Sequence, residues 1–157
     1  NMTHETFMRA AIALSQKNVD DGTGGPFGAV VVRDGEIIGE GTNLVTSAND
    51  PTAHAEVVAI RQACERLGTY NLEGCVVYTS CEPCPMCLSA IYWARLDRIF
   101  YGNTKVDAAK IDFDDDFLYR EIPKPISERT IPTEQLLHDE SIAAFDAWAK
   151  SEIKIPY

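Results

Sequence analysis

Residues 81–87 read Cys81-Glu82-Pro83-Cys84-Pro85-Met86-Cys87, and an upstream stretch reads Thr52-Ala53-His54-Ala55-Glu56. Cys84 and Cys87 lie three residues apart at the start of an expected helix, a spacing that lets both thiolates reach one ion. His54 begins another expected helix and can add an imidazole nitrogen to the same tetrahedral site. The two segments therefore predict one zinc ion bound by His54, Cys84 and Cys87.

Three protein ligands leave the fourth corner of a tetrahedral zinc site open for water, which is the arrangement of a catalytic site. The ligands stand at helix starts, where free amides and the helix dipole favour thiolate over thiol. Zinc in such a site can lower the pKa of its water to about 7. Glu56 can converge on this water from the first helical turn, so we expect it to shuttle protons.

Other interpretations of the cysteines stay open at this point. Cys81 could close the zinc site as a fourth ligand and make the protein a non-catalytic scaffold, although Glu56 would then have no role. A C-x-x-C pair can also be redox active, but a redox motif needs no upstream His-x-Glu. Cys64 and Cys75 fall at apolar positions of an expected helix and strand, so we expect them in the core.

Hydrophobic periodicity around the two motifs predicts an alternation of helices and strands. Helices are expected at about 5–18, 54–67, 85–94, 115–122 and 139–151, strands at 29–32, 37–38, 75–79 and 98–101, and a loop at 46–51. Asp34-Gly35 indicates a β-hairpin between the first two strands. The strand, helix and strand from 75 to 101 favour a parallel pair. We expect one α/β domain over residues 1–157.

Composition narrows the possible partners. The chain has 157 residues and a formal net charge of −10, and its basic residues are scattered singly. Nucleic-acid binders normally present a basic stripe, so no nucleic acid partner is expected. No apolar run is long enough to span a membrane, and residues 2–16 lack the apolar stretch of a secretory signal. The five cysteines suit metal binding in a reducing compartment, so we expect a cytoplasmic protein.

His-x-Glu followed by Pro-Cys-x-x-Cys is the signature of the zinc deaminases. Over almost its whole length the chain resembles the bacterial-type guanine deaminases of the cytidine/deoxycytidylate deaminase superfamily. The zinc motifs specify only the superfamily, whereas a Phe-Asp-Asp segment and an aromatic C-terminus point to guanine. The segments that carry the resemblance are Gly24 to Gly28, Asn49 to Glu56, Tyr78 to Cys87, Ala90 to Arg95, Phe113-Asp114-Asp115, Glu128 to Pro132 and Tyr157.

This resemblance implies a fold, a reaction and an assembly. The fold is a three-layer α/β/α sandwich around a five-stranded mixed sheet, with one Zn²⁺ per subunit. The reaction is the hydrolysis of guanine, a small purine base, to xanthine and ammonia. The assembly is a homodimer in which the C-terminal segment, about 133–157, can swap between subunits.

The resemblance also assigns individual residues. Asp115 would assist Glu56 in proton transfer and read the polar edge of the base, a role that alignment gives to Asp115 rather than Asp114. Asp112 stands before Phe113 where these enzymes often have Gly. The implied substrate contacts are Asn43, Phe27, Ala55, Trp93, Asp115 and Tyr157.

Neighbouring activities share these motifs. A tRNA adenosine deaminase carries the same His-x-Glu and Pro-Cys-x-x-Cys pair, but it must bind a polyanion. Guanosine, cytosine, cytidine, isocytosine-like bases and aminotriazines also carry a ring amino group that the same chemistry could remove. The motifs alone do not distinguish among these substrates.

Overall fold

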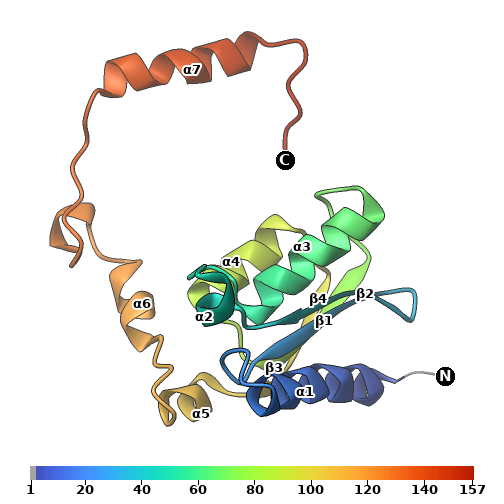
Figure 1. Cartoon of the computed structure of the whole chain (residues 1–157). Coiled ribbons are helices and arrows are strands. Elements are labelled where there is room, and N and C mark those ends of the chain that lie inside the picture. Colours follow the sequence, from blue (N-terminus) through green and yellow to red (C-terminus); the bar gives the residue numbers. More distant parts are fainter. Residues whose placement is uncertain (1–2) are drawn as a thin grey trace. The chain divides into compact units, whose positions relative to one another are not determined.

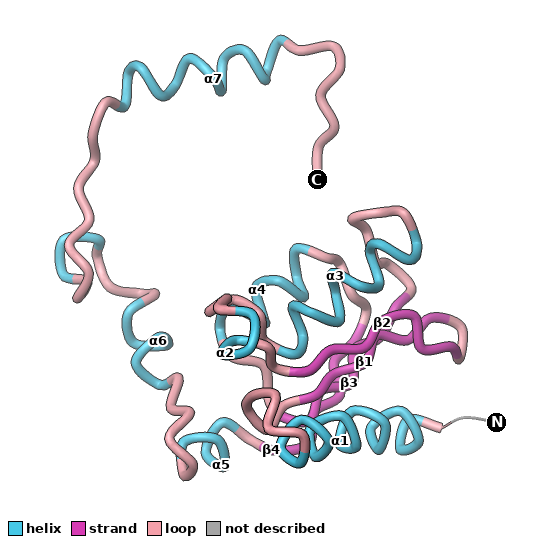
Figure 2. Tube along the Cα trace, viewed as in Figure 1, coloured by secondary structure: helices cyan, strands magenta, loops and turns pink. Residues whose placement is uncertain are grey.

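The computed structural model describes residues 3–157, which divide into two compact units, one ending at Asp115 and one spanning Asp116–Tyr157. The first holds a β-sheet and most of the helices, and the second is helical (Figures 1 and 2). Within the described range, no helix combines the length and the apolar character needed to cross a membrane.

The sheet contains β1 (Gly28–Arg33), β2 (Glu36–Thr42), β3 (Cys75–Cys81) and β4 (Arg98–Asn103), in the order β2-β1-β3-β4. β1 runs antiparallel to β2 and β3, while β3 and β4 are parallel. Asp34 and Gly35 both have positive φ, 49° and 75°, as a tight hairpin turn requires. The predicted hairpin and the predicted parallel pair are therefore confirmed.

Helices cover both faces of this sheet. On one face α1 (His4–Asp20) packs Phe7 and Ala11 against Val30 and Tyr78. On the other face α3 (Ala55–Leu67) and α4 (Pro85–Trp93) pack against the sheet and form a second apolar core with it (Figure 1). The three-layer α/β/α arrangement expected from the sequence is thus present in the first unit.

The expectation of a fifth strand was wrong, because within residues 3–157 the sheet has four strands. Directly after β4, Thr104 caps α5 (Lys105–Ala109): its side chain accepts a hydrogen bond from the backbone N–H of Asp107, and the Asp107 carboxylate accepts one from the backbone N–H of Thr104. This capping box starts a helix where a further strand would begin. A short helix, α2 (Val45–Ala48), also occupies part of the expected loop at 46–51.

The second unit contains α6 (Asp116–Glu121), a 3₁₀ turn η1 (Ile126–Glu128) and α7 (His138–Lys150), so both predicted C-terminal helices are confirmed. Glu121 stabilises this turn by accepting hydrogen bonds from Lys124 and from Thr130. These hydrogen bonds lower the pKa of the Glu121 carboxyl group to about 2. None of residues 116–157 is buried. This unit therefore has no apolar core of its own.

Two glycines of β2 allow α3 to lie unusually close to the sheet. A Cβ atom at Gly41 would fall well inside van der Waals distance of the Ala55 carbonyl oxygen, and one at Gly39 would overlap the Ala59 carbonyl in the same way. The facing residues of α3 are alanines that are fully buried. This close packing determines where α3 begins, and hence where His54 and Glu56 stand.

Replacing Gly41 by Ala tests this constraint. The added methyl group must push the first turn of α3 away from β2, because it meets backbone and not a flexible side chain. We expect a loss of about 2–4 kcal/mol in the free energy of unfolding, as for other overpacked core sites, together with a reduced zinc content after purification. Thermal denaturation and metal analysis measure the two effects.

Gly74→Ala is the matched control. Gly74 has a φ of 84°, but a Cβ atom there meets open space. The control should cost only about 1 kcal/mol of backbone strain and should keep its full zinc content. A Gly41→Ala protein with the stability and zinc content of the control would contradict the packing argument.

Candidate active site

The three predicted zinc ligands come from the starts of two helices beside the carboxyl end of β3. His54 is the N-cap residue of α3 and Cys84 that of α4, both in extended conformation. Pro85 occupies the first turn of α4, where its missing N–H costs no hydrogen bond. Cys87 lies one turn into α4 and is fully buried. The folded chain therefore brings together residues that lie 30 or more positions apart.

The geometry of these ligand atoms fits a zinc ion. His54 Nδ1 lies 3.5 Å from Cys84 Sγ and 3.5 Å from Cys87 Sγ. The three ligand atoms lie within 4.8 Å of one another. Tetrahedral zinc with Zn–N and Zn–S bonds of about 2.0 and 2.3 Å would separate nitrogen from sulfur by about 3.5 Å. The two nitrogen–sulfur distances thus match those of a tetrahedral zinc site that holds one Zn²⁺.

Cys81 does not complete this ligand group. Its sulfur lies 3.8 Å from the Thr104 carbonyl oxygen, and burial raises the pKa of its thiol to about 11. Among the described residues, the metal-ligating cluster contains His54, Cys84 and Cys87 and leaves Cys81 out. A position for water stays available, as in catalytic zinc sites. Cys75 is buried in the core and Cys64 packs against it, as predicted.

Glu56 lies in the first turn of α3 with only 6% of its surface exposed. Burial raises the pKa of its carboxyl group to about 7, while a hydrogen bond with Cys87 and the charge of His54 act in the opposite direction. A zinc ion bound next to it would favour the carboxylate form. Glu56 therefore lies beside the ligand cluster in an environment where it can both accept and release a proton.

Two of the predicted substrate contacts lie together near the end of β2. Asn43 is nearly buried, and its backbone N–H donates to the Phe27 carbonyl at 3.3 Å. Asn43 Oδ1 accepts a hydrogen bond from the backbone N–H of Val45, which orients the amide. The Nδ2 group is then the donor that Asn43 can offer to a ligand.

Phe27 is linked in turn to the Phe-Asp-Asp segment. Its ring meets that of Phe113 edge to face, with the centroids 5.0 Å apart. Asp115 is half-buried, and partial burial together with the charge of Cys84 raises its pKa, whereas Asp114 is exposed. Asp115 is thus within electrostatic range of Cys84, and its role toward a ligand stays a prediction.

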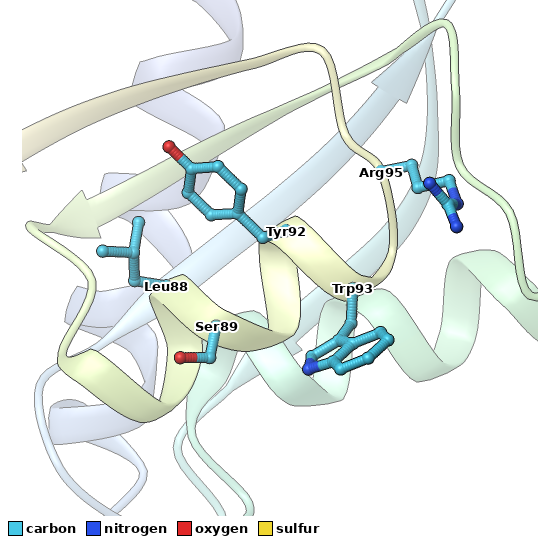
Figure 3. Close-up of a pocket in the computed structure, with 5 residues that line it drawn as sticks. All are labelled: Leu88, Ser89, Tyr92, Trp93 and Arg95. Atoms are coloured by element: carbon cyan, nitrogen blue, oxygen red, sulfur yellow. The ribbon is translucent and has the colours of Figure 1, made fainter. Parts of the chain in front are cut away.

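The other three predicted substrate contacts, Ala55, Trp93 and Tyr157, differ in burial. Ala55 is fully buried beneath β2, next to His54. Trp93 is 68% exposed and lines a hollow of about 450 Å³ with Leu88, Ser89, Tyr92 and Arg95. Figure 3 shows Leu88, Ser89, Tyr92 and Trp93 on α4 and Arg95 just after the end of that helix, and none of the three zinc ligands lines this hollow. Tyr157 belongs to the second unit and is exposed.

Two buried polar residues near the site were missed in the sequence. Asn18 donates hydrogen bonds from its side chain to the Gly25 and Asn43 carbonyls, and Ser80 accepts one from the Gly28 N–H. Asn18 lies on the same buried face of α1 as Phe7 and Ala11. A polar residue on this otherwise apolar helix face was the sequence signal that could have identified Asn18. Ser80 lies next to the last residue of β3, a largely buried strand, where a single hydroxyl group is a weak signal in the sequence.

This fold and this ligand group define a class of protein. Residues 1–103 match the family model described as the cytidine and deoxycytidylate deaminase zinc-binding region. The chain belongs to this family and is a zinc-dependent hydrolase of the deaminase type.

Within the family, the chain is similar over 99% of its length to guanine deaminase from Bacillus subtilis, with 56% identity over the whole of that protein. The solved structure of that enzyme superimposes with a TM-score of 0.97, covering 99% of each chain. Guanine deaminase from Nitrosomonas europaea is 30% identical, with a TM-score of 0.69 over 81% of this chain and 70% of its own. A tRNA-specific adenosine deaminase from Aquifex aeolicus is 41% identical, over 64% of this chain and 66% of its own.

Asp112 offers a test of the segment that leads to Asp115. It has a φ of 71°, a left-handed conformation that favours Gly. We expect Asp112→Gly to raise the free energy of unfolding by about 0.5–1 kcal/mol, because relief of strain outweighs the larger entropy of Gly in the unfolded chain. Urea denaturation measures the change.

Asp114→Gly serves as the comparison, since Asp114 is exposed and is not among the positive-φ residues. There the same substitution should destabilise the protein, because it relieves no left-handed backbone and gives the unfolded chain more freedom. Equal destabilisation of the two variants would show that residue 112 carries no backbone strain.

Proposed function

We propose that this protein hydrolyses guanine to xanthine and ammonia. The observation that carries the proposal is the similarity to Bacillus subtilis guanine deaminase, because it extends over the whole chain and includes the C-terminal unit. The tRNA-specific relatives match between 49% and 72% of the chain. The residues around the ligand cluster supply the groups that such a hydrolysis needs.

The chain's own residues account for the proton transfers. Zinc, when held by His54, Cys84 and Cys87, supplies a water molecule of lowered pKa as the nucleophile. Glu56 would take one proton from this water and deliver it to the ring nitrogen next to the attacked carbon. It would then take the second proton from the new hydroxyl group and give it to the departing amine, which leaves as ammonia while the hydroxyl becomes a carbonyl. Asp115 assists this transfer at the polar edge of the base. The buried position of Glu56 keeps its carboxyl group away from bulk water.

Recognition of the base rests on a few hydrogen bonds and apolar surfaces. Asn43 donates from Nδ2 to the base, and Phe27 packs against its ring together with Ala55 and Trp93. Asp115 accepts hydrogen bonds from the base edge. Such contacts discriminate strongly, because a base that lacks the matching groups leaves buried polar atoms unpaired.

The charge of the chain argues against the tRNA alternative. A formal net charge of −10 opposes the approach of a polyanion, whereas a small base such as guanine carries no such cost. We therefore propose a cytoplasmic enzyme of small-molecule metabolism that binds neither nucleic acid nor membrane.

Ammonia release from guanine, guanosine, adenine, cytosine and cytidine tests the substrate proposal. We expect activity on guanine alone, because the other compounds either present different groups to Asn43 and Asp115 or carry a ribose. The measurement is coupled ammonia detection at equal substrate concentrations. Higher kcat/KM on guanosine or cytosine than on guanine would refute the proposal.

Replacing Glu56 by Gln tests the proton shuttle. The amide retains the size of the side chain but cannot exchange protons, so kcat should fall by about 100- to 10,000-fold. Metal analysis should show one zinc per chain, as in the unchanged protein, because none of the three ligands is altered. Near-normal turnover by this variant would remove Glu56 from the mechanism.

We further propose that the protein works as a homodimer and that the segment 133–157 swaps between subunits, so that Tyr157 caps the partner's site. The second unit buries none of its residues, and α7 carries Ile142, Phe145 and Trp148 along one stripe. An apolar stripe without a core of its own favours packing against another surface. Swapping would place this stripe of α7 against the partner subunit.

Mixing two impaired chains tests the swap. Glu56→Gln has a defective site and an intact tail, while Tyr157→Ala has an intact site and a defective tail. In a swapped heterodimer the tail of the first chain caps the site of the second. After subunit exchange at equal amounts, activity should reach about a quarter of that of the unchanged dimer. Activity no higher than that of Tyr157→Ala alone would exclude capping in trans.

A further inference from the structure

A single buried amide joins two walls of the proposed base pocket. Asn18, near the end of α1, is 3% exposed. Its Nδ2 donates to the Gly25 carbonyl at 2.8 Å and to the Asn43 carbonyl at 3.0 Å. Gly25 belongs to the loop that carries Phe27, and Asn43 is the proposed donor to the base. Both N–H groups of one side chain are thus used to hold the two segments together.

The backbone around this bridge is tightly packed. The Asn43 N–H donates to the Phe27 carbonyl at 3.3 Å, so the loop and Asn43 are also linked directly. A Cβ atom at Gly24 would overlap the Asn43 carbonyl oxygen, which shows how closely the loop passes that group. The Asn18 carbonyl in turn accepts a hydrogen bond from the Thr23 N–H at 3.1 Å. A shift of Asn18 would therefore move Phe27 and Asn43 together.

The zinc ligands are positioned by other elements than those that Asn18 joins. His54 and Cys84 are N-cap residues of α3 and α4, on the face of the sheet opposite to α1. Asn18 makes these two side-chain hydrogen bonds to the loop and to Asn43, and neither of them involves a zinc ligand or Glu56. A change at Asn18 can therefore alter the pocket walls while the reaction centre stays intact.

We propose that Asn18 is a positioning residue for substrate binding: its buried amide sets the spacing of Phe27 and Asn43 and thereby the affinity for the base. The proposal rests on guanine as the substrate and on Asn43 and Phe27 as its contacts. Loss of the amide leaves two buried carbonyl oxygens without their donor, so the loop and the end of β2 separate or rearrange to reach water.

The test uses Asn18→Leu and Asn18→Asp in the full zinc-loaded protein. Both variants keep the approximate shape of the side chain and lose the two N–H donors. We expect KM for guanine to rise about tenfold or more, the effect of one displaced hydrogen bond, with kcat changed much less and zinc content unchanged. Amide hydrogen exchange should quicken in residues 24–28 and 43–45, which report the spacing independently of any substrate.

Phe7→Leu is the matched control, because Phe7 is buried on the same helix but packs against Tyr78. It should lower the melting temperature without changing KM or the exchange of the two segments. If Asn18→Leu does not fold, Asn18→Asp decides the question, since it is nearly isosteric with Asn.

The outcomes separate the two proposals. If the unchanged protein deaminates guanine and both Asn18 variants retain its KM, the positioning role is wrong and the proposed function stands. A KM increase as large in Phe7→Leu as in the Asn18 variants would also overturn it, by showing that general loss of stability is the cause. If the unchanged protein does not act on guanine, the proposed function fails. In that case the positioning role is judged by amide hydrogen exchange alone, and Asn18 variants whose exchange at 24–28 and 43–45 is unaltered would overturn it.

Discussion

The close approach of α3 to β2 is the constraint on which the site depends. Side chains at positions 39 and 41 would prevent it, because an ideal Cβ atom at either glycine overlaps backbone atoms of the helix. Alanines on the facing side of α3 complete a contact made almost entirely by backbone and methyl groups. Because interiors pack at near-crystalline density, this contact leaves the first turn of α3 little freedom. His54 and Glu56 take their positions from it.

Two helix starts facing one another then make the metal site. The N-cap position suits His54 and Cys84 because its extended backbone turns the side chain out of the helix, beyond the first turn. Cys87, one turn later, comes back to the same point. The backbone amides and the dipoles at the starts of α3 and α4 add positive potential where two thiolates must be accommodated. The same arrangement leaves Glu56 buried beside the ligands and not among them.

Much of this was predictable from residue patterns with local causes. The Asp34-Gly35 turn, the stop of α3 at the left-handed Gly68 and the parallel pair around α4 follow from turn chemistry, helix capping and periodicity. The fifth strand was expected from family resemblance and not from such a pattern, and Thr104 with Asp107 starts a helix there instead. The bridge made by Asn18 was missed because its partners, Gly25 and Asn43, lie in other elements.

The sequence by itself determined which residues could bind zinc, because thiolates and imidazole at these spacings have few other uses together. It also determined the local elements, since capping, turns and periodicity act over a few neighbouring residues. Only the tertiary structure decided that Cys81 stays outside the ligand group, how deeply Glu56 is buried, and that one amide of α1 joins the loop of Phe27 to Asn43. Burial and distance depend on which elements pack together, and that packing is a property of the whole fold that no single segment encodes.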